Sequence, residues 1–136
     1  MTAFALDASV ALAWVMREAR SAVCEPLFRE AMRDGAAAPI LWRAEVGNVL
    51  LISERRGRID PRQHDAARAT LEELGVELDD GAFRGGDMLV PLARRHRLTL
   101  YDAAYLELAL RRHLPLATLD AELRAAAADE GVATLP

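Results

Sequence analysis

The sequence contains no lysine, since all 17 of its basic residues are arginine. This absence excludes every reaction mechanism that depends on a lysine side chain. A phosphate-binding P-loop requires its lysine, and no glycine-rich phosphate loop is present either. Phosphoacceptor receiver domains and most haloacid-dehalogenase-type phosphatases place an acid after their first strand, as this chain does, but both normally require a lysine. The composition therefore argues strongly against these phosphate-handling classes.

Cysteine and long apolar runs are also scarce. Cys24 is the only cysteine, which excludes an internal disulfide and a cysteine-rich metal site. The longest apolar run, residues 8–16, is far shorter than a membrane-spanning helix. It follows Asp7 and not the basic segment that opens a signal peptide. We therefore expect a cytoplasmic protein without a membrane segment.

The order of apolar segments predicts the fold class. The 136 residues suffice for one domain and not for two, so we expect a single domain over residues 1–136. Short apolar runs alternate with longer helix-like segments, which favours an α/β fold with a mainly parallel sheet. The expected strands are residues 3–6, 36–39, 76–78, 115–119 and 132–135. The expected helices begin near Ser9 and cover residues 18–33, 41–56, 60–74, 86–96, 100–112 and 120–130.

Two acidic residues follow expected strands. Asp7 stands after residues 3–6, and Asp120 stands after residues 115–119. In open parallel sheets ligands bind beyond the carboxyl ends of the strands, so both carboxylates would lie at the binding edge. Either residue could instead cap the helix that follows it, because aspartate is a favoured N-cap.

Two further acids lie within expected helices. Glu45 and Asn48 interrupt an apolar stripe that we expect to face the core. A buried glutamate needs a cation, a hydrogen-bond partner or a raised pKa, and an ion pair with an arginine is the simple alternative. Asp102 has apolar neighbours three and four residues on, while Thr99 and Asp102 match the T-x-x-D form of a capping box. The box would hold Asp102 at a helix N-terminus, where negative charge is favoured.

A shared cation would explain all four acids. Carboxylates gathered in one place repel one another unless a cation compensates them. Oxygen ligands without a cysteine or histidine cluster favour Mg²⁺ or Mn²⁺ over Zn²⁺. A cation held in this way and open to water suits phosphodiester hydrolysis. The chain has 21 acidic residues against 17 arginines, so its net charge of −4 equals the charge of these four carboxylates.

The arginines could bind a nucleic acid. Three clusters stand at the C-termini of expected helices: Arg55-Arg56-Arg58, Arg94-Arg95-Arg97 and Arg111-Arg112. Cations are favoured there by the helix dipole, and we expect that end of each helix to lie opposite the acids. Arg17, Arg20 and Arg43 are therefore the candidates for contacting substrate phosphates. The histidines lie at polar or helix-terminal places, which disfavours a metal-independent histidine-pair ribonuclease.

Four segments together resemble the PIN-domain family, and specifically its VapC-type toxin ribonucleases. These segments are DASVALAWV, PILWRAEVGNVL, LTLYDAAYLELALRRHLPLATLDAEL and the terminal VATLP. The likeness spans nearly the whole chain in the family's order and spacing, although residues 58–90 show little of its signature. It implies a three-layer α/β/α sandwich around a five-stranded parallel sheet. By position, the core acids would be Asp7, Glu45 and Asp102, the fourth acid would be Asp120, and the supporting residues would be Ser9, Asn48 and Thr118.

The resemblance also implies a function. A VapC-type toxin is a metal-dependent endoribonuclease that uses Mg²⁺ or Mn²⁺ and leaves 5′-phosphate and 3′-hydroxyl ends. A VapB-type antitoxin would cover the acidic cleft, and the toxin would form a homodimer. Apolar residues on the first two expected helices could serve such contacts, although core packing also explains them: Leu12, Trp14, Val15, Leu27 and Phe28. The alternatives are a catalytically silent PIN-like interaction module and a nuclease acting on DNA. The chain is too short to carry the extra helices that a nuclease of the second kind needs for duplex substrates.

Overall fold

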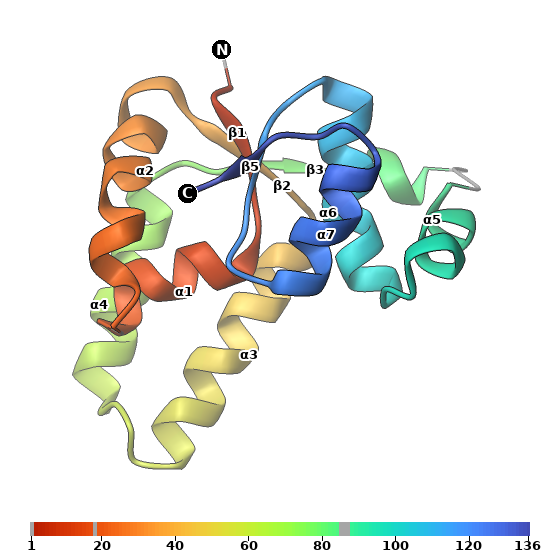
Figure 1. Ribbon diagram of the computed structural model, residues 1–136. Helices are drawn as coiled ribbons and strands as arrows, with labels where there is room; N and C mark the ends of the chain where they lie inside the picture. Colours follow the sequence, from red (N-terminus) through yellow and green to blue (C-terminus); the bar gives the residue numbers. More distant parts are fainter. Residues whose placement is uncertain (1, 18, 85–87) are drawn as a thin grey trace.

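A computed structural model describes residues 2–17, 19–84 and 88–136 of the chain, and it confirms the predicted α/β fold. Within these residues five short parallel strands form one sheet in the order β3-β2-β1-β4-β5, with helices on both of its faces (Figure 1). The strands are β1 (Phe4–Leu6), β2 (Ala36–Pro39), β3 (Glu77–Asp79), β4 (Leu116–Ala117) and β5 (Thr134–Leu135). The helices are α1 (Ala8–Met16), α2 (Ser21–Asp34), α3 (Leu41–Arg55), α4 (Pro61–Glu73), η1 (Gly81–Phe83, a 3₁₀ turn), α5 (Leu89–His96), α6 (Leu100–Arg112) and α7 (Ala121–Asp129).

The predicted elements are all present, with ends that differ by a few residues. Strand β4 is shorter than expected, and the turn η1 was not anticipated. The first expected residue of the second helix, residue 18, lies outside the described residues, as do residues 86–87 of the helix expected over 86–96. None of the described helices is long and apolar enough to cross a membrane.

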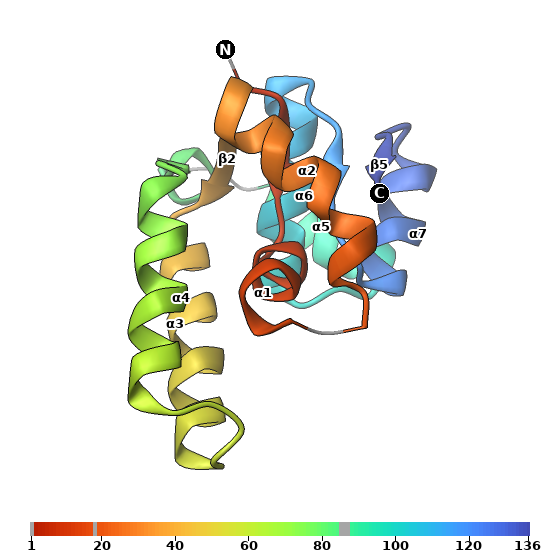
Figure 2. The ribbon, with the colours of Figure 1, turned by 90° about the vertical axis from the view of Figure 1, so that its left-hand side faces the viewer.

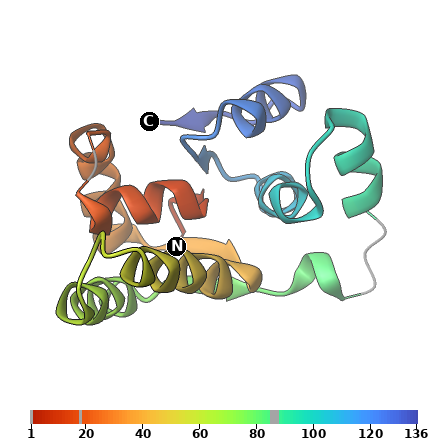
Figure 3. The ribbon, with the colours of Figure 1, turned by 90° about the horizontal axis from the view of Figure 1, so that it is seen from below.

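The strand order places the binding edge between β1 and β4. The chain moves outward from β1 to β2 and β3, then returns to the other side of β1 for β4 and β5. Because crossovers between parallel strands are right-handed, helices α1–α4 lie on one face of the sheet and α5–α7 on the other (Figures 1 and 3). The direction of winding switches between β1 and β4. Ligands of open α/β sheets bind beyond the carboxyl ends of the strands at this switch point.

Helices α3 and α4 form an antiparallel pair that extends away from the sheet. They run side by side in two views related by a quarter turn (Figures 1 and 2). A capping box around Pro61 fixes the start of α4. The Asp60 side chain accepts a hydrogen bond from the Gln63 amide, and the Gln63 side chain accepts one from the Asp60 amide. Since α3 starts at the carboxyl edge of the sheet, its first two turns form a wall beside that edge.

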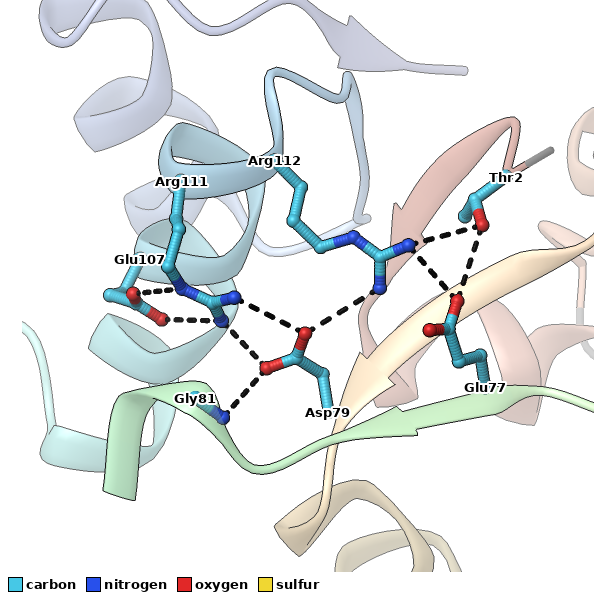
Figure 4. A network of polar contacts seen from close by, with 7 residues as sticks. All are labelled: Thr2, Glu77, Asp79, Gly81, Glu107, Arg111 and Arg112. Carbon is cyan, nitrogen blue, oxygen red and sulfur yellow. Dashed lines mark hydrogen bonds and ion pairs between the residues drawn. The ribbon is translucent and has the colours of Figure 1, made fainter. Parts of the chain in front are cut away.

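Helix α6 is the central helix of the other face. Every residue from Ala103 to Ala109 is buried, including Glu107. Glu107 is compensated by Arg111, whose Nε lies 2.6 Å from Glu107 Oε1 and whose Nη2 lies 2.6 Å from Asp79 Oδ1 (Figure 4). Burial is the largest single influence on the pKa of Asp79 and raises it. The hydrogen bonds from Arg111 and the Gly81 amide, together with the charges of Arg111 and Arg112, outweigh burial and lower that pKa. This network fastens the C-terminal half of α6 to β3, and so it fixes the direction in which the N-terminus of α6 points.

Candidate active site

Asp7 lies at the carboxyl end of β1 and is only 5% exposed. Its side chain makes no capping hydrogen bond with α1, so the capping alternative is wrong for this residue. Two hydroxyl groups donate to the same carboxylate oxygen, Oδ2: Ser9 Oγ at 2.6 Å and Thr118 Oγ1 at 2.7 Å. The other oxygen, Oδ1, accepts no side-chain hydrogen bond among the described residues. No side-chain donor of the described residues therefore competes with a ligand for Oδ1, while burial raises the pKa of this carboxylate and the Ala8 amide partly offsets that rise.

The two hydroxyls are themselves oriented by the backbone after β4. The Leu119 amide donates to Ser9 Oγ at 2.9 Å, and the Asp120 amide donates to Thr118 Oγ1 at 3.1 Å. A hydroxyl that accepts from an amide directs its own proton to another acceptor, which here is Asp7. The short strand β4 allows this arrangement, because the chain leaves the sheet at Thr118 and turns its amides toward α1. The predicted contact of Ser9 and Thr118 with the acids is thus present for Asp7.

Glu45 projects from the second turn of α3 toward α6. The phenol of Tyr105, which is completely buried, donates to Glu45 Oε1 at 2.9 Å. Among the described residues no arginine forms an ion pair with Glu45, so the simple alternative of an Arg–Glu pair is wrong. The expected core-facing stripe through Glu45 is also wrong, because the buried face of α3 is formed by Trp42, Val46, Leu50 and Ser53. Glu45 and Asn48 lie on a different face, which borders the carboxyl edge of the sheet.

Asp102 lies in the first turn of α6, as the capping box predicted. The amide of Asp102 donates to Thr99 Oγ1 at 3.1 Å, so Thr99 caps the helix. The carboxylate of Asp102 makes no hydrogen bond back to the backbone of Thr99 among the described contacts, and the box is half formed. Asp102 is therefore placed by the cap, and a hydrogen bond with the Thr99 side chain partly offsets the rise that burial causes in its pKa.

Asp120 follows β4 and caps α7, since its Oδ1 accepts from the Leu123 amide at 2.9 Å. The capping alternative is correct for Asp120, and it is compatible with a role in the site. The bond uses one carboxylate oxygen and sets the side chain at the same edge of the sheet as Asp7. The charge of Asp120 is close enough to raise the pKa of both Asp7 and Asp102, although burial is the larger cause for each.

The acids act on one another electrostatically. Burial is the largest cause that raises the pKa of Asp7, of Glu45 and of Asp102. The hydroxyl bonds to Asp7 and the phenol bond to Glu45 oppose this increase but do not cancel it. The charges of Asp7 and Asp102 raise the pKa of Glu45 further. The fold therefore gathers four carboxylates. No arginine or histidine among the described residues lowers the pKa of Asp7, Glu45 or Asp102.

The donor set fits a hard divalent cation. The available ligands are carboxylate oxygens, which Mg²⁺ and Mn²⁺ prefer. Across residues 2–17, 19–84 and 88–136, no three acidic, histidine or cysteine side chains are already arranged to enclose an ion. Carboxylates that repel one another are expected to stand apart until a cation draws them together. The acids thus suit a divalent cation by the chemistry of their oxygen atoms and by their common position at the carboxyl edge of the sheet.

The other residues predicted for the site lie farther from the acids. Asn48 is exposed one turn beyond Glu45, and its supporting role stays a prediction. Arg17 is the C-cap of α1 and Arg20 the N-cap of α2, at the end of α1 that lies away from Asp7. Arg43 lines a cavity between α3 and α4 together with Trp42. The fold does not bring these three arginines to the acids, and their phosphate-binding role also stays a prediction.

Two features were missed from the sequence. Tyr105 resembled an ordinary core residue, and only its pairing with Glu45 across 60 positions shows its contact with the site. The expectation that all three arginine clusters lie opposite the acids is wrong for Arg94-Arg95-Arg97. Helix α5 ends at His96 and α6 begins at Leu100, so this cluster stands beside the first turn of α6. The short connection between the helices was the signal that could have indicated it.

Comparison with known proteins identifies the family. The sequence model of the PIN domain matches residues 4–129. The chain belongs to the PIN-domain family. The crystal structure of PAE2754 from Pyrobaculum aerophilum is similar to this PIN domain, with a TM-score of 0.72 and 27% sequence identity, over 98% of this chain and 90% of that one. No curated protein matches the chain in sequence. PIN domains are typically metal-dependent nucleases, which agrees with the chemistry of the acidic edge.

Proposed function

We propose that this PIN domain is a metal-dependent endoribonuclease toxin that acts on RNA in the cytoplasm and is neutralised by a VapB-type antitoxin. The observation that carries the proposal is the gathering of Asp7, Glu45, Asp102 and Asp120 at the switch point of the sheet. The mutual repulsion in such a cluster destabilises a protein until a cation binds and compensates the negative charge. The cofactor proposed for it is Mg²⁺, with Mn²⁺ as a substitute.

The hydrogen bonds divide the oxygens of the site into fixed and available ones. Ser9 and Thr118 fix Oδ2 of Asp7, and Tyr105 fixes Oε1 of Glu45. Oδ1 of Asp7 and Oε2 of Glu45 would then hold the cation. A carboxylate with one oxygen fixed by neutral hydroxyls keeps its full charge and a single orientation, which is the usual way in which outer contacts prepare a metal ligand.

Asp102 and Asp120 complete the donor set. Asp120 uses Oδ1 for its cap and would offer Oδ2, while both oxygens of Asp102 are free of backbone contacts. The bound cation would neutralise the charge that develops on the scissile phosphate and favour deprotonation of the attacking water. Acids in excess of those that hold the cation would accept the proton of that water.

The products follow from the nucleophile. Attack by water leaves a 5′-phosphate and a 3′-hydroxyl, whereas attack by the ribose 2′-hydroxyl would leave a 2′,3′-cyclic phosphate. The second route needs a base such as histidine, and the histidines here are placed elsewhere: His64 contacts Glu54, His96 contacts Glu130, and His113 ends α6. We therefore propose hydrolysis by water.

The proposed partners are the antitoxin and a second copy of the chain. Trp14 packs edge-on against Phe28 with ring centroids 5.4 Å apart, and Leu27 is buried. Intramolecular packing thus accounts for much of the apolar surface on α1 and α2. The proposal of an antitoxin and a homodimer rests on the family resemblance, and size-exclusion chromatography of the purified chain would test the dimer.

The deciding experiment is cleavage of end-labelled RNA and DNA pools with Mg²⁺ or Mn²⁺, with and without EDTA. Asp7→Asn and Asp102→Asn are compared with the wild type, and Asp65→Asn on the exposed surface of α4 is the matched control. We expect metal-dependent cutting of RNA that only the first two substitutions abolish. Absence of both cutting and metal binding would favour a silent interaction module, and preferential cutting of DNA would refute the RNA assignment.

A further inference from the structure

An exposed aromatic side chain stands beside the acids. Tyr101 directly precedes Asp102 at the N-terminus of α6 and is 64% exposed, and its neighbour Leu100 is half exposed. Tyr101 and Tyr105 are four residues apart, so they lie on the same face of the helix. Tyr105 reaches Glu45 of α3 from this face. Tyr101 therefore lies one turn nearer the N-terminus of α6 than Tyr105, on the same side of the helix.

Helix α3 faces this side of α6. Asn48 and Val49 follow Glu45 by three and four residues, and both are exposed. Because α3 extends beyond the carboxyl edge of the sheet (Figure 1), Asn48 and Val49 lie one turn farther along α3 from the sheet than Glu45. An exposed amide and an exposed apolar side chain thus follow Glu45 on this helix.

A basic cleft lies on the other side of the first turn of α6, between α5 and α7. It has a volume of about 440 Å³. Its lining residues are Arg94, Arg95, His96, Arg97, Glu122, Ala125, Ala126 and Asp129. Arg95 and His96 are both bonded to Glu130, at 2.7 and 3.0 Å. Arg94 and Arg97 form no ion pair among the described residues, so these two guanidinium groups are available for a ligand.

The wall of the cleft that belongs to α7 begins two residues after Asp120. Glu122 stands two residues after Asp120, and its charge acts on Asp102, whose pKa is raised chiefly by burial and by the charge of Asp120. The connection from α5 to α6 spans only residues 97–99, so the C-terminus of α5 lies next to the N-terminus of α6. Tyr101, Asp102 and Arg97 therefore all lie at the N-terminal end of α6.

We propose that an unpaired RNA strand crosses the N-terminus of α6, with one base stacked on Tyr101 and with backbone phosphates held by Arg94 and Arg97. This inference rests on the proposed nuclease function and assigns its substrate contacts. A strand with a phosphodiester at Asp102 would offer an adjacent base to the ring of Tyr101. Its neighbouring phosphates would lie toward Arg94 and Arg97. Bases of a duplex are already stacked, so only an unpaired base can use Tyr101.

Binding is the first test, measured by fluorescence anisotropy of a labelled single-stranded RNA in the Asp7→Asn background, which prevents cleavage. We expect Tyr101→Ala to weaken binding by about 5- to 100-fold and Tyr101→Phe to bind as the parent does, because stacking needs only the ring. Phe83→Ala is the matched control: Phe83 is also an exposed aromatic residue, and it lies in η1 beside the C-terminal half of α6. Equal affinity of Tyr101→Ala and the parent would overturn the stacking assignment.

Salt dependence tests the two arginines separately. Each phosphate contact to a single strand contributes about 0.7 to the slope of log affinity against log salt concentration. We expect Arg94→Gln and Arg97→Gln each to reduce the slope by about that amount, and Arg29→Gln on the exposed surface of α2 to leave it unchanged. An unchanged slope in both cleft variants would overturn the phosphate assignment.

Cleavage in the otherwise wild-type chain separates this inference from the proposed function. We expect Tyr101→Ala to raise KM with little change in kcat, and a fully paired RNA to be cut much more slowly than its single strand. If the wild type cuts RNA but Tyr101→Ala, Arg94→Gln and Arg97→Gln cut it equally well, the inference fails and the nuclease stands. If the wild type neither binds nor cuts RNA, the nuclease proposal fails, and the inference fails with it.

Discussion

Replacing Tyr105 by phenylalanine would test how the site holds Glu45. The substitution removes one oxygen atom from a side chain that is fully buried, and it leaves the ring to fill the same space. The lost contact is the 2.9 Å hydrogen bond from the phenol to Glu45 Oε1. No other side-chain donor to Glu45 is present among the described residues, so its carboxylate would be free to rotate about its own bonds.

The expected losses differ between stability and metal binding. A hydrogen bond to a charged group contributes roughly 1.5–3 kcal/mol, but Glu45 is only partly buried and water can replace part of this contribution. We therefore expect the free energy of unfolding of the metal-free protein to fall by about 1 kcal/mol. Loss of an outer contact to a metal ligand typically lowers metal affinity by about 10- to 100-fold, and we expect an effect of this size on Mn²⁺.

Electron paramagnetic resonance of free Mn²⁺ during titration measures the affinity, and urea unfolding in EDTA measures the stability. Tyr101→Phe is the matched control, because it removes the same oxygen from the exposed tyrosine one turn away. A Tyr105→Phe protein that binds Mn²⁺ and cuts RNA as the wild type does would refute the claim that the phenol positions Glu45. A loss confined to stability would show that the bond serves the fold alone.

Three further outcomes are expected. The folded state raises the pKa of Asp7 above its ordinary value of 3.8, chiefly through burial. Folding therefore favours the protonated acid, and the contribution of this group to stability is lost as pH rises through the raised pKa. Melting curves in EDTA should show this decline, Mg²⁺ should reverse it, and Asp7→Asn should reduce it, because the raised pKa values of Glu45 and Asp102 act in the same direction. Thr118→Val deprives Asp7 of one of two hydroxyl donors, so the free energy of unfolding should fall by roughly 1–3 kcal/mol in urea titrations, and an unchanged value would mean that Ser9 alone suffices. In Gly81→Ala a Cβ atom would lie 2.5 Å from Arg111 Cζ and would displace that guanidinium. The free energy of unfolding should fall by about 1 kcal/mol, while the affinity for Mn²⁺ is retained. A reduced Mn²⁺ affinity would contradict the separation of the Arg111 network from the acidic site.

The sequence predicted the elements well because local signals were strong. The apolar run before Asp7, the residue pair Asp60-Pro61 and the cap at Thr99 each correspond to an observed boundary. The acids were also identifiable, since a carboxylate after a strand or on an otherwise apolar helix requires an explanation. Capping alone could not be separated from a role in the site, and in the structure Asp120 has the cap while Asp7 has the hydroxyl contacts.

Interactions between distant segments were not predictable in the same way. The partner of Glu45 is a phenol 60 residues away, and the choice between phenol and guanidinium depends on how α6 crosses α3. The face of α3 was also misassigned, because its apolar residues continue around the helix and only the position of the sheet decides which of them are buried. The site of Arg97 depended on a turn between α5 and α6 that reverses the chain, and periodicity alone does not report such a reversal.

The arrangement of hydroxyl groups around Asp7 gives a physical reason for the use of neutral donors at this edge. An arginine beside Asp7 would lower its pKa and stabilise the metal-free protein, but it would also compete with a divalent cation for the same oxygens. Ser9 and Thr118 stabilise only one oxygen and bring no charge. Burial, and to a smaller degree the repulsion among the acids, keeps the pKa values of Asp7, Glu45 and Asp102 raised. The free energy that this repulsion removes from the metal-free fold is recovered when a cation binds, so a site built with hydroxyls binds its metal more tightly than one built with arginines.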